Sequence, residues 1–392
     1  MEPRRVADGI DWVGAIDWDR KVFDDLVPLT EGTSYNAWLV RGTARTALFD
    51  TVDPSMLHVL RARLGGVDRI DYVVSHHAEQ DHAGCLPWVM ERWPDAEVLA
   101  SRRGRDLLAD ELHVDPARIR AVEDGETIDL GGRTVRFLAM PWVHWPETVV
   151  SFIPEDGTLL SCDMFGSHVA QSELLAGDGR RAMAGSRRYY AEIMMPFRAQ
   201  IEKHLDRLAT LPIARILPSH GPAWETPAVI LGAWREWVSA PPANLAVVLY
   251  VSMHGSTRVM AEHLVGALAD RGVEVRQFNL TGVDVGELAS ALVEADTIVF
   301  ATPTVLAGAH PNAASAAFLV NAIKPKARHL AFVGSHGWAP GKAADQIAGL
   351  TSALKAEWLP PVQAKSLPRA DDLAAIDRLA DEIARRHVRL PA

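Results

Sequence analysis

Two imidazoles and two carboxylates lie within six residues of the segment SHHAEQDHAG, at His77, Glu79, Asp81 and His82. Alternate residues of an extended loop share one side, so His77, Glu79 and Asp81 can face a common ion, with His82 turning in to join them. Charged groups are costly to bury unless they coordinate a metal or pair with an opposite charge. The cluster therefore predicts a metal site.

Three later residues have the types and positions to complete this site. His144 lies in MPWVHWPET, Asp163 in LLSCDMFGS and His220 in LPSHGP, each near the end of a predicted strand. Loops held by a rigid β scaffold commonly carry binding residues. Seven nitrogen and oxygen ligands are enough for a site that holds two metal ions. Cys85 and Cys162 adjoin these ligands, but we expect them to be small buried fillers.

A second group of small polar residues, SMHGSTR at 252–258, lies between a predicted strand and a predicted helix. Backbone N–H groups at a helix N-terminus can surround a phosphate, together with the hydroxyls of Ser252, Ser256 and Thr257. Hydroxyl residues at this place can also be plain N-caps. Two further loops, TPTVLAG at 302–308 and GSHGW at 334–338, follow later strands. In an open parallel sheet ligands bind beyond the carboxyl ends of the strands, so the three loops should converge on one ligand.

Strands that could position the metal ligands recur through residues 1–240, separated by Gly, Pro and Asp turn signals. The β-type segments are TALFDTV, DYVVSHH, AEVLAS, RTVRFLAM, TVVSFIP and TLLSCDM. Helical periodicity occurs in SMLHVLRARLGG and from Arg187 through Leu208. The proline-rich segment SAPPAN, from Ser239 to Asn244, is predicted to link two domains.

Residues 245–392 alternate regularly between strand and helix patterns. The predicted strands are LAVVLYVS, VEVRQFNL, DTIVFATPT, HLAFVGS and VQAKSL, and two of the predicted helices are TRVMAEHLVGALADRG and VGELASALVEA. Such alternation indicates a parallel sheet covered by helices on both faces.

The bulk composition limits the possible partners and compartments. A chain of 392 residues is long enough for two domains with separate cores. A net charge of −10 argues against nucleic acid as the main partner. We find no apolar run that could span a membrane and no signal peptide, so a cytoplasmic protein is predicted. Two cysteines exclude a disulfide framework and an all-cysteine metal site.

The motif His-x-Glu-x-Asp-His, followed by a distant His, an Asp and a final His, resembles the metallo-β-lactamase superfamily. Hydrolases of that superfamily usually bind zinc and have His where Glu79 stands here. A carboxylate at this position adds a hard anionic ligand, which favours iron over zinc. Together with Glu79, the segments YYAEIMMPF (189–197) and PSHGP (218–222) resemble the A-type flavodiiron proteins.

The resemblance implies a diiron centre in which each iron has its own ligands and one carboxylate bridges the pair. One iron would be bound by His77, Glu79 and His144, the other by Asp81, His82 and His220, and the bridge would be Asp163. It also implies an α/β fold with two domains: a metallo-β-lactamase-like αββα sandwich over residues 1–240, followed by a flavodoxin-like doubly wound parallel sheet over residues 245–392.

The second domain resembles a flavodoxin that binds FMN. The residues implied to surround FMN are Ser252, Met253, His254, Gly255, Ser256 and Thr257 around the phosphate, and Thr302, Pro303, Thr304, Val305, Leu306, Ala307, Gly308, Ser335, His336, Gly337 and Trp338 around the isoalloxazine. Relatives commonly have an aromatic residue at the positions of His254 and His336, and asparagine at those of Leu306 and Ala307. These departures would change the affinity and the potential of the flavin.

The function that the resemblance implies is reduction of O2 to water, of NO to N2O, or of both, with electrons supplied through FMN. The chain has no Cys-x-x-Cys pair and hence no rubredoxin-like domain, so we expect a separate donor such as a rubredoxin or its reductase. Each cofactor would occupy the loop end of its own domain. The resemblance therefore implies a head-to-tail homodimer, or a dimer of dimers, that brings FMN to the irons of the partner chain.

Other functions fit parts of the pattern. One is a zinc-dependent hydrolase of the metallo-β-lactamase class with an attached flavodoxin domain. Another is an electron carrier whose metal site is structural, and a third is a protein that has lost FMN.

Several residues beside the predicted ligands also need an assignment. His76 should point away from the metals, and His168 could serve in proton delivery. Tyr35, Trp145 and Tyr190 could line the pocket, although aromatic residues near a site more often belong to the core. Trp145 is the best placed of the three because it is next to a ligand.

Overall fold

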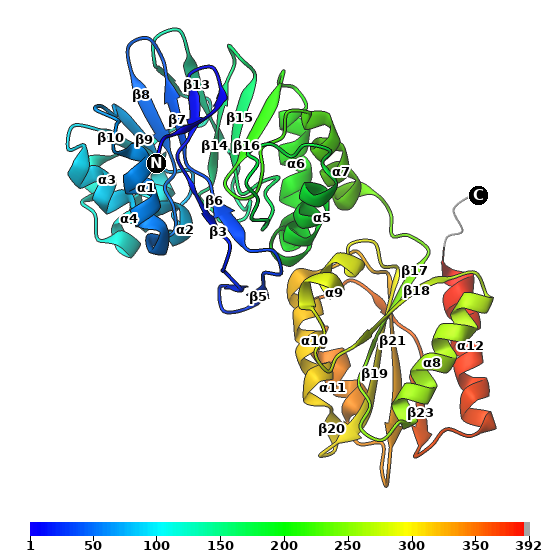
Figure 1. Cartoon of the computed structure of the whole chain (residues 1–392). Helices are drawn as coiled ribbons and strands as arrows, with labels where there is room; N and C mark the ends of the chain where they lie inside the picture. The colour runs from blue at the N-terminus through cyan, green and yellow to red at the C-terminus, as the bar shows by residue number, and fades with distance from the viewer. Residues whose placement is uncertain (388–392) are drawn as a thin grey trace. The chain divides into compact units, whose positions relative to one another are not determined.

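The computed structural model of the chain describes residues 1–387 and contains two compact units (Figure 1). The first unit comprises Met1–Tyr190 and Phe197–Val238, and the second comprises Ala191–Pro196 and the chain from Ser239 onward. The predicted linker, residues 239–244, lies at the start of the second unit. The sequence did not indicate that Ala191–Pro196 would group with the second unit.

The first unit is a sandwich of two β-sheets. Its larger sheet has the strand order β1 (Arg4–Ala7), β2 (Ile10–Trp12), β7 (Trp38–Arg41), β8 (Thr46–Phe49), β9 (Tyr72–Val74), β10 (Glu97–Ser101) and β11 (Ile119–Val122). Its smaller sheet has the order β12 (Thr127–Asp129), β13 (Thr134–Ala139), β14 (Val149–Ile153), β15 (Thr158–Cys162) and β16 (Arg215–Pro218). Two short ladders pair β3 (Ala15–Asp17) with β6 (Thr33–Tyr35) and β4 (Val22–Phe23) with β5 (Val27–Pro28).

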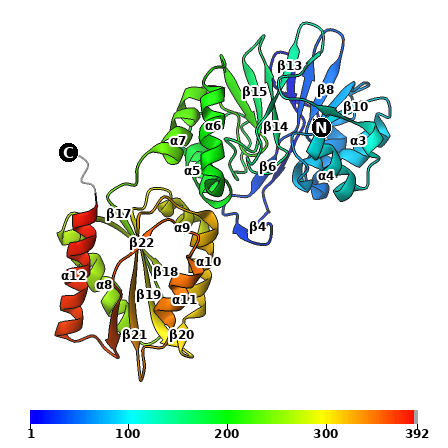
Figure 2. The same cartoon turned by 180° about the vertical axis from the view of Figure 1, so that it is seen from behind.

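Helices cover the outer face of each sheet (Figures 1 and 2). The larger sheet is covered by α1 (Leu57–Leu64), α3 (Leu86–Arg92) and α4 (Arg102–Leu112), and the smaller by α5 (Arg180–Tyr189), α6 (Arg198–Leu208) and α7 (Pro227–Ser239). Between the sheets, Phe49, Val74, Phe137 and Leu160 belong to one fully buried core. This layering confirms the predicted αββα sandwich.

Six of the strands in this unit were predicted, namely β8, β9, β10, β13, β14 and β15. The N-terminal strands were missed because β1–β7 are only two to four residues long. Strands this short give little periodic signal, and β2 and β6 are buried at every position instead of alternating.

The stretch from Arg187 through Leu208, in which the sequence shows helical periodicity, is helical but is not one continuous α-helix. Helix α5 ends at Tyr189 and is followed by a π-helical turn at Tyr190–Met194, a 3-10 turn at Met195–Phe197, and then α6. Pro196 has no N–H group, and its ring would clash with the preceding helical turn, so a regular α-helix cannot continue through it.

The second unit is a parallel sheet with helices on both faces (Figure 1). Its strand order is β18 (Glu274–Asn279), β17 (Leu245–Tyr250), β19 (Thr297–Val305) and β21 (His329–His336), and the outer side of β21 pairs with β22 (Glu357–Trp358) and β23 (Val362–Lys365). One face carries α8 (Ser256–Asp270) and α12 (Ala370–Arg386); the other carries α9 (Val285–Leu292), α10 (Pro311–Ile323) and α11 (Ala343–Leu350). This order confirms the predicted flavodoxin-like doubly wound sheet. Among the helices within residues 1–387, none has the length and apolar character needed to cross a membrane.

Candidate metal centre and cofactor pocket

The seven predicted metal ligands come from four loops of the first unit. The loop after β9 runs into the short helix α2 (Gln80–Ala83) and carries the clustered ligands of the His-x-Glu-x-Asp-His motif. His144 lies between β13 and β14, Asp163 directly follows β15, and His220 follows β16. Because β15 and β16 are parallel neighbours, their carboxyl ends bring Asp163 and His220 to the same edge.

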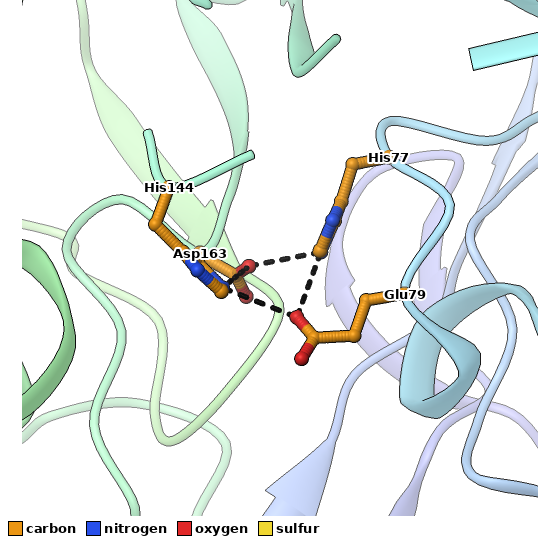
Figure 3. A group of neighbouring side chains, drawn as sticks. All are labelled: His77, Glu79, His144 and Asp163. Atoms are coloured by element: carbon orange, nitrogen blue, oxygen red, sulfur yellow. Dashed lines mark ion pairs between the residues drawn. The ribbon is translucent and has the colours of Figure 1, made fainter. Parts of the chain in front are cut away.

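Four of these residues form a first ligand group, drawn in Figure 3: His77, Glu79, His144 and Asp163. Their ligand atoms all lie within 4.8 Å of one another. Nε2 of His144 is 3.1 Å from Oε2 of Glu79 and 3.4 Å from Oδ2 of Asp163, and Nε2 of His77 is 2.9 Å from the same Oδ2. Two imidazole nitrogens and two carboxylates thus converge on one point, as the ligands of one cation would.

Asp81, His82 and His220 form a second ligand group, and all three are buried. Nε2 of His220 is 3.2 Å from Oδ2 of Asp81, and Nε2 of His82 is 3.4 Å from Oδ1 of Asp81. Asp163 also faces this group, because its Oδ1 is 3.1 Å from Nε2 of His82 and 3.5 Å from Nε2 of His220. A carboxylate that offers one oxygen to each group is arranged as the bridge of a two-metal site.

Many polar atoms of both groups are buried close to charged neighbours but make no hydrogen bond of regular geometry. Within residues 1–387 this holds for both ring nitrogens of His77 and His82 and for both carboxylate oxygens of Asp81 and Asp163. Leaving such atoms unsatisfied is costly, and coordination of cations would satisfy them. The predicted ligands therefore fit two metal ions.

Charges inside the site shift the pKa values of its members. Burial alone would lower the pKa of His144, but hydrogen bonds to Asp163 and Glu79 outweigh it and raise the pKa to about 10. Burial likewise opposes the charge on His82, yet Asp81 and Asp163 raise its pKa well above the usual value. Burial would raise the pKa of Asp163, but His82 and His77 hold it well below its usual range. A cation that enters the metal-free site must therefore displace protons from imidazoles.

Residues behind the ligands fix the orientation of two histidines. Nδ1 of His220 is 2.7 Å from the carbonyl oxygen of Ser34, so it donates to that oxygen and leaves Nε2 free for a metal. His76 is turned away, as predicted, because its Nδ1 lies 2.6 Å from Oδ2 of Asp50 and its Nε2 lies 2.9 Å from Oγ of Ser151. The pair of His76 and Asp50 therefore holds the start of the ligand loop instead of a metal.

His168 lies directly against the second ligand group. Its ring centroid is 4.8 Å from that of His220, and its Nδ1 is 2.9 Å from Oγ1 of Thr33. Burial and the neighbouring His220 hold the pKa of His168 well below its usual value, so its imidazole is neutral. The ring of Phe23, from β4, lies 4.8 Å from that of His168 in a tilted arrangement and 6.1 Å from that of His220.

Of the three aromatic residues considered from the sequence, two lie beside ligands. Trp145 is 5.6 Å from His77 and Tyr35 is 5.9 Å from His220, measured between ring centroids. Tyr190 packs instead on Trp234 and Trp237, whereas the adjacent Tyr189 contacts His168 at 5.0 Å and His220 at 5.9 Å. The sequence did not separate these two tyrosines, because the break at the end of α5 decides which one faces the site.

Both cysteines behave as buried fillers. Cys85 and Cys162 are buried, and neither belongs to the ligand groups found among the described residues. Burial raises the pKa of the Cys85 thiol to about 12, so it is protonated at neutral pH.

A cavity of about 380 Å³ lies beyond the carboxyl ends of β17, β19 and β21. Eleven of the residues predicted to contact FMN line it: Ser252, Met253, His254, Ser256, Thr257, Pro303, Thr304, Ser335, His336, Gly337 and Trp338. Ser366 also lines the cavity, although its sequence context gave no signal. Gly255 lines a neighbouring cavity of about 340 Å³ together with Arg258.

The start of α8 has the features of a phosphate site. Gly255 precedes the helix with φ of +93°, and its N–H group donates to Oγ of Ser252 at 3.1 Å. The hydroxyls of Thr257 and Ser335 are 2.8 Å apart and tie the helix start to the end of β21. Hydroxyls and a helix N-terminus therefore face the cavity, as the phosphate of FMN requires.

The other predicted FMN residues, Thr302, Val305, Leu306, Ala307 and Gly308, are not among those that line this cavity. Thr302 is buried within β19, and the rest belong to the hairpin of β19 with β20 (Gly308–Ala309). Leu306 and Ala307 form the tip of this hairpin, with φ of +49° and +65°. Asparagine tolerates such angles better than leucine or alanine does.

Comparisons with known proteins agree over the whole chain. Residues 33–221 match the family described as ODP family beta lactamase, and residues 248–376 match the flavodoxin family. The chain is 34% identical to the nitric oxide reductase of Moorella thermoacetica, covering 98% of this chain and 99% of that protein. It is 30% identical to the rubredoxin-oxygen oxidoreductase of Megalodesulfovibrio gigas, covering 98% of each. This chain belongs to the flavodiiron protein family.

Solved structures of this family have the same fold. The rubredoxin oxygen:oxidoreductase from Desulfovibrio gigas matches with a TM-score of 0.93 at 29% identity, over 98% of both chains. The flavodiiron protein from Giardia intestinalis matches with a TM-score of 0.92 at 27% identity, over 98% of this chain and 97% of that chain. Membership confirms the predicted oxidoreductase class over the zinc hydrolase, and it confirms two irons and FMN as the cofactors.

Proposed function

We propose that this flavodiiron protein reduces O2 to water, NO to N2O, or both, at a diiron centre that receives electrons from FMN. The observation that carries the proposal is the position of Asp163, whose two carboxylate oxygens face two separate ligand groups. The names of the relatives support both gases, since one is a nitric oxide reductase and another a rubredoxin-oxygen oxidoreductase. Both reactions use the same ligands, so the ligand set supports either gas.

Each side chain has a defined part in this proposal. One iron would be held by His77, Glu79 and His144, the other by Asp81, His82 and His220, with Asp163 between them. When bound, the irons would supply the binding site for the gas and the electrons for its reduction. The side chains of Glu79 and His144 are 15% and 16% exposed, whereas the other five ligand side chains are at most 5% exposed. The gas would therefore enter on the side of Glu79 and His144.

The cavity in the second unit is the proposed FMN site. Residues 252–257 would hold the phosphate, and the loops at 303–304 and 335–338 would surround the isoalloxazine. Trp338 is 93% exposed beside this cavity, so its ring is free to cover a flavin. The proposed electron donor is a rubredoxin-type protein, as the name of one relative suggests. The cytoplasmic location stays a prediction.

Head-to-tail dimerisation is proposed from exposed apolar side chains at both sites. Near the metal centre, Leu26 on the turn between β4 and β5 is 68% exposed and Trp142 on the loop of His144 is 44% exposed. Beside the FMN cavity, Met253, Leu306 and Trp338 are 53%, 98% and 93% exposed. Exposed apolar side chains at both sites would be covered if these surfaces met. Pairing these two surfaces between copies would bring FMN to the irons of the partner.

Purification without oxygen, followed by reconstitution with Fe²⁺ and FMN, tests the function directly. The expected result is two irons and one FMN per chain, with consumption of O2 or NO by the chemically reduced protein. The Asp163→Ala variant should keep FMN and lose gas consumption. Reconstituted protein that consumes neither gas would contradict the proposed function.

Mixed oligomers test the dimer. Chains with Asp163→Ala would be co-expressed with chains carrying Ser256→Glu, which places a negative charge where the phosphate binds. A head-to-tail dimer should recover activity, because the intact FMN of one chain faces the intact irons of the other. A monomer in sedimentation, or mixed chains without activity, would contradict this arrangement.

A further inference from the structure

Glu147 is a buried carboxylate beside the metal centre to which neither the motif nor the ligand groups assign a part. Its side chain is fully buried, and it lies in the segment HWPET three residues after His144. A buried carboxylate without a paired cation is costly, so it persists only where other groups satisfy it. The groups it faces belong to the ligand loop.

One oxygen of Glu147 contacts that loop in two ways. Oε1 accepts the N–H of Ala78 at 3.0 Å, and Ala78 is the residue between the ligands His77 and Glu79. The same oxygen lies 4.0 Å from Nδ1 of His77. Within the described chain, neither Nδ1 of His77 nor Oε2 of Glu147 has a hydrogen-bond partner. His77 therefore has a buried potential donor without a partner 4.0 Å from the Glu147 carboxylate, and that carboxylate has one oxygen still free to accept.

The segment that carries Glu147 is itself held in place. The N–H and hydroxyl of Thr148 both contact the carbonyl oxygen of Trp145, at 3.4 Å and 3.0 Å. The carbonyl oxygen of Glu147 accepts a hydrogen bond from Oγ of Ser101 at 2.7 Å, and Val149 N–H donates to the carbonyl of His76 at 2.9 Å. Glu147 is thus fixed against the ligand loop from both sides.

The chemistry of His77 decides what this arrangement can do. Its Nε2 faces the first ligand group, so metal binding requires the tautomer with the proton on Nδ1. A metal-bound histidine usually donates its other N–H to a carboxylate or a carbonyl, which fixes its ring and increases its basicity. Closing the gap of 4.0 Å to hydrogen-bond length needs a movement of about 1 Å.

We propose that Glu147 is a positioning residue of the metal centre, which accepts the Nδ1–H of His77 and holds the Ala78 amide so that His77 and Glu79 present their ligand atoms to one metal. The proposal rests on the two-metal function proposed above. It adds a residue outside the ligand set and predicts that the two metals depend on it unequally, because Glu147 contacts His77 and Ala78, and the ligands on either side of Ala78, His77 and Glu79, both belong to the first group.

Three substitutions separate the hydrogen bond to His77 from the support of the backbone. Glu147→Gln keeps an oxygen for the Ala78 amide but removes the negative charge that faces His77. Glu147→Asp keeps the charge on a shorter side chain, and Glu147→Ala removes both functions. Glu111→Gln is the matched control, because burial and the nearby Glu147 raise the pKa of Glu111 while it belongs to neither ligand group.

The measurement is anaerobic competition titration of Fe²⁺ against a chelator, with the two binding steps resolved, alongside thermal unfolding of each metal-free variant. We expect Glu147→Gln to weaken one binding step about 10- to 100-fold and leave the other within about twofold. Glu147→Asp should recover part of this loss, and Glu147→Ala should lose most. Glu111→Gln should bind both metals like the wild type.

Two results would overturn the positioning role while the proposed function stands. One is Glu147→Gln binding both metals as tightly as the wild type, since the backbone support alone would then suffice. The other is an equal loss of affinity at both metal-binding steps of Glu147→Gln, together with a lower unfolding temperature of the metal-free variant. If Glu147→Gln does not fold, the same comparison is made with Glu147→Asp. Wild-type protein that binds fewer than two metals per chain would overturn the two-metal function and the role of Glu147 with it.

Discussion

Raising the pH should tighten metal binding steeply, because a metal must compete with protons for His144 and His82. Burial opposes the charged form of His144, but its hydrogen bonds to Asp163 and Glu79 raise its pKa to about 10. The pKa of His82 is also raised well above its usual value, against burial, by Asp81 and Asp163. Both imidazoles therefore carry protons in the metal-free protein at neutral pH.

The size of the effect follows from the number of protons released. While the pH stays below the pKa of about 10, His144 alone makes the apparent affinity rise about tenfold for each pH unit. Between pH 6.5 and pH 8.5 this amounts to about 100-fold. Release of a second proton from His82 would bring the slope toward about two powers of ten per pH unit.

Stability of the metal-free fold should change in the opposite direction. A folded-state pKa raised above the unfolded value of about 6.5 contributes stability that is complete below pH 6.5 and is lost as the pH rises through about 10. Metal-free protein should therefore unfold at lower temperature as the pH rises from 6.5 to 8.5, while its metal affinity increases.

Competition titration with Co²⁺ and a chelator of known protonation constants measures the slope, and thermal unfolding of the same metal-free samples measures the stability. The variant His58→Gln, at an exposed histidine on α1, should leave both pH dependences unchanged. A metal affinity that does not change between pH 6.5 and pH 8.5 would refute the protonation of His144 and His82 in the metal-free protein. It would also refute the ion pairs that these imidazoles are expected to form with the carboxylates of the site.

Three further predictions concern substitutions in the two sites. Asp163→Ala should lose both metals by elemental analysis, whereas His144→Ala should retain one; an Asp163→Ala protein that keeps one tight metal would show that this carboxylate serves one group only. Leu306→Asn with Ala307→Gly should stabilise the second unit by about 1 kcal/mol per residue in urea unfolding, because the φ angles of both residues lie in the left-handed region, which strains Leu and Ala. An unchanged free energy of unfolding would argue against backbone strain at this turn. Gly255→Val should weaken FMN binding at least about tenfold in fluorescence titration, because φ of +93° strains any β-branched residue; equal affinity would place the phosphate elsewhere.

The ligand positions could be predicted from the sequence because metal coordination restricts residue types strongly. His77, Glu79, Asp81 and His82 are polar groups in a segment that the fold buries or nearly buries, which only a specific function explains. The fold of the second unit could also be predicted, because the alternation of strand and helix patterns after Leu245 is regular and is typical of a parallel sheet covered by helices.

Features that depend on turns of the chain or on tertiary packing could not be predicted from the local sequence pattern. The helical periodicity from Arg187 through Leu208 is interrupted after Tyr189, where a π-helical turn begins, and Tyr189 instead of Tyr190 lies beside His220. The left-handed angles at Leu306 and Ala307 are set by the two-residue hairpin between β19 and β20, although neither side chain favours them. In each case a distant or geometric constraint overrides the preference of the residue itself.

Glu147 illustrates the same limit at the metal centre. Its glutamate in HWPET looks like any charged loop residue, because nothing within a few positions indicates that it will be fully buried. Its role becomes visible only when the loop after β13 folds against the loop after β9, 69 residues earlier in the chain at Ala78. Ligands are recognisable from their types, whereas the residues that orient ligands are ordinary in type and distinctive only in position. For that reason the unequal loss of the two metals in Glu147→Gln tests the structure more strictly than loss of any ligand would.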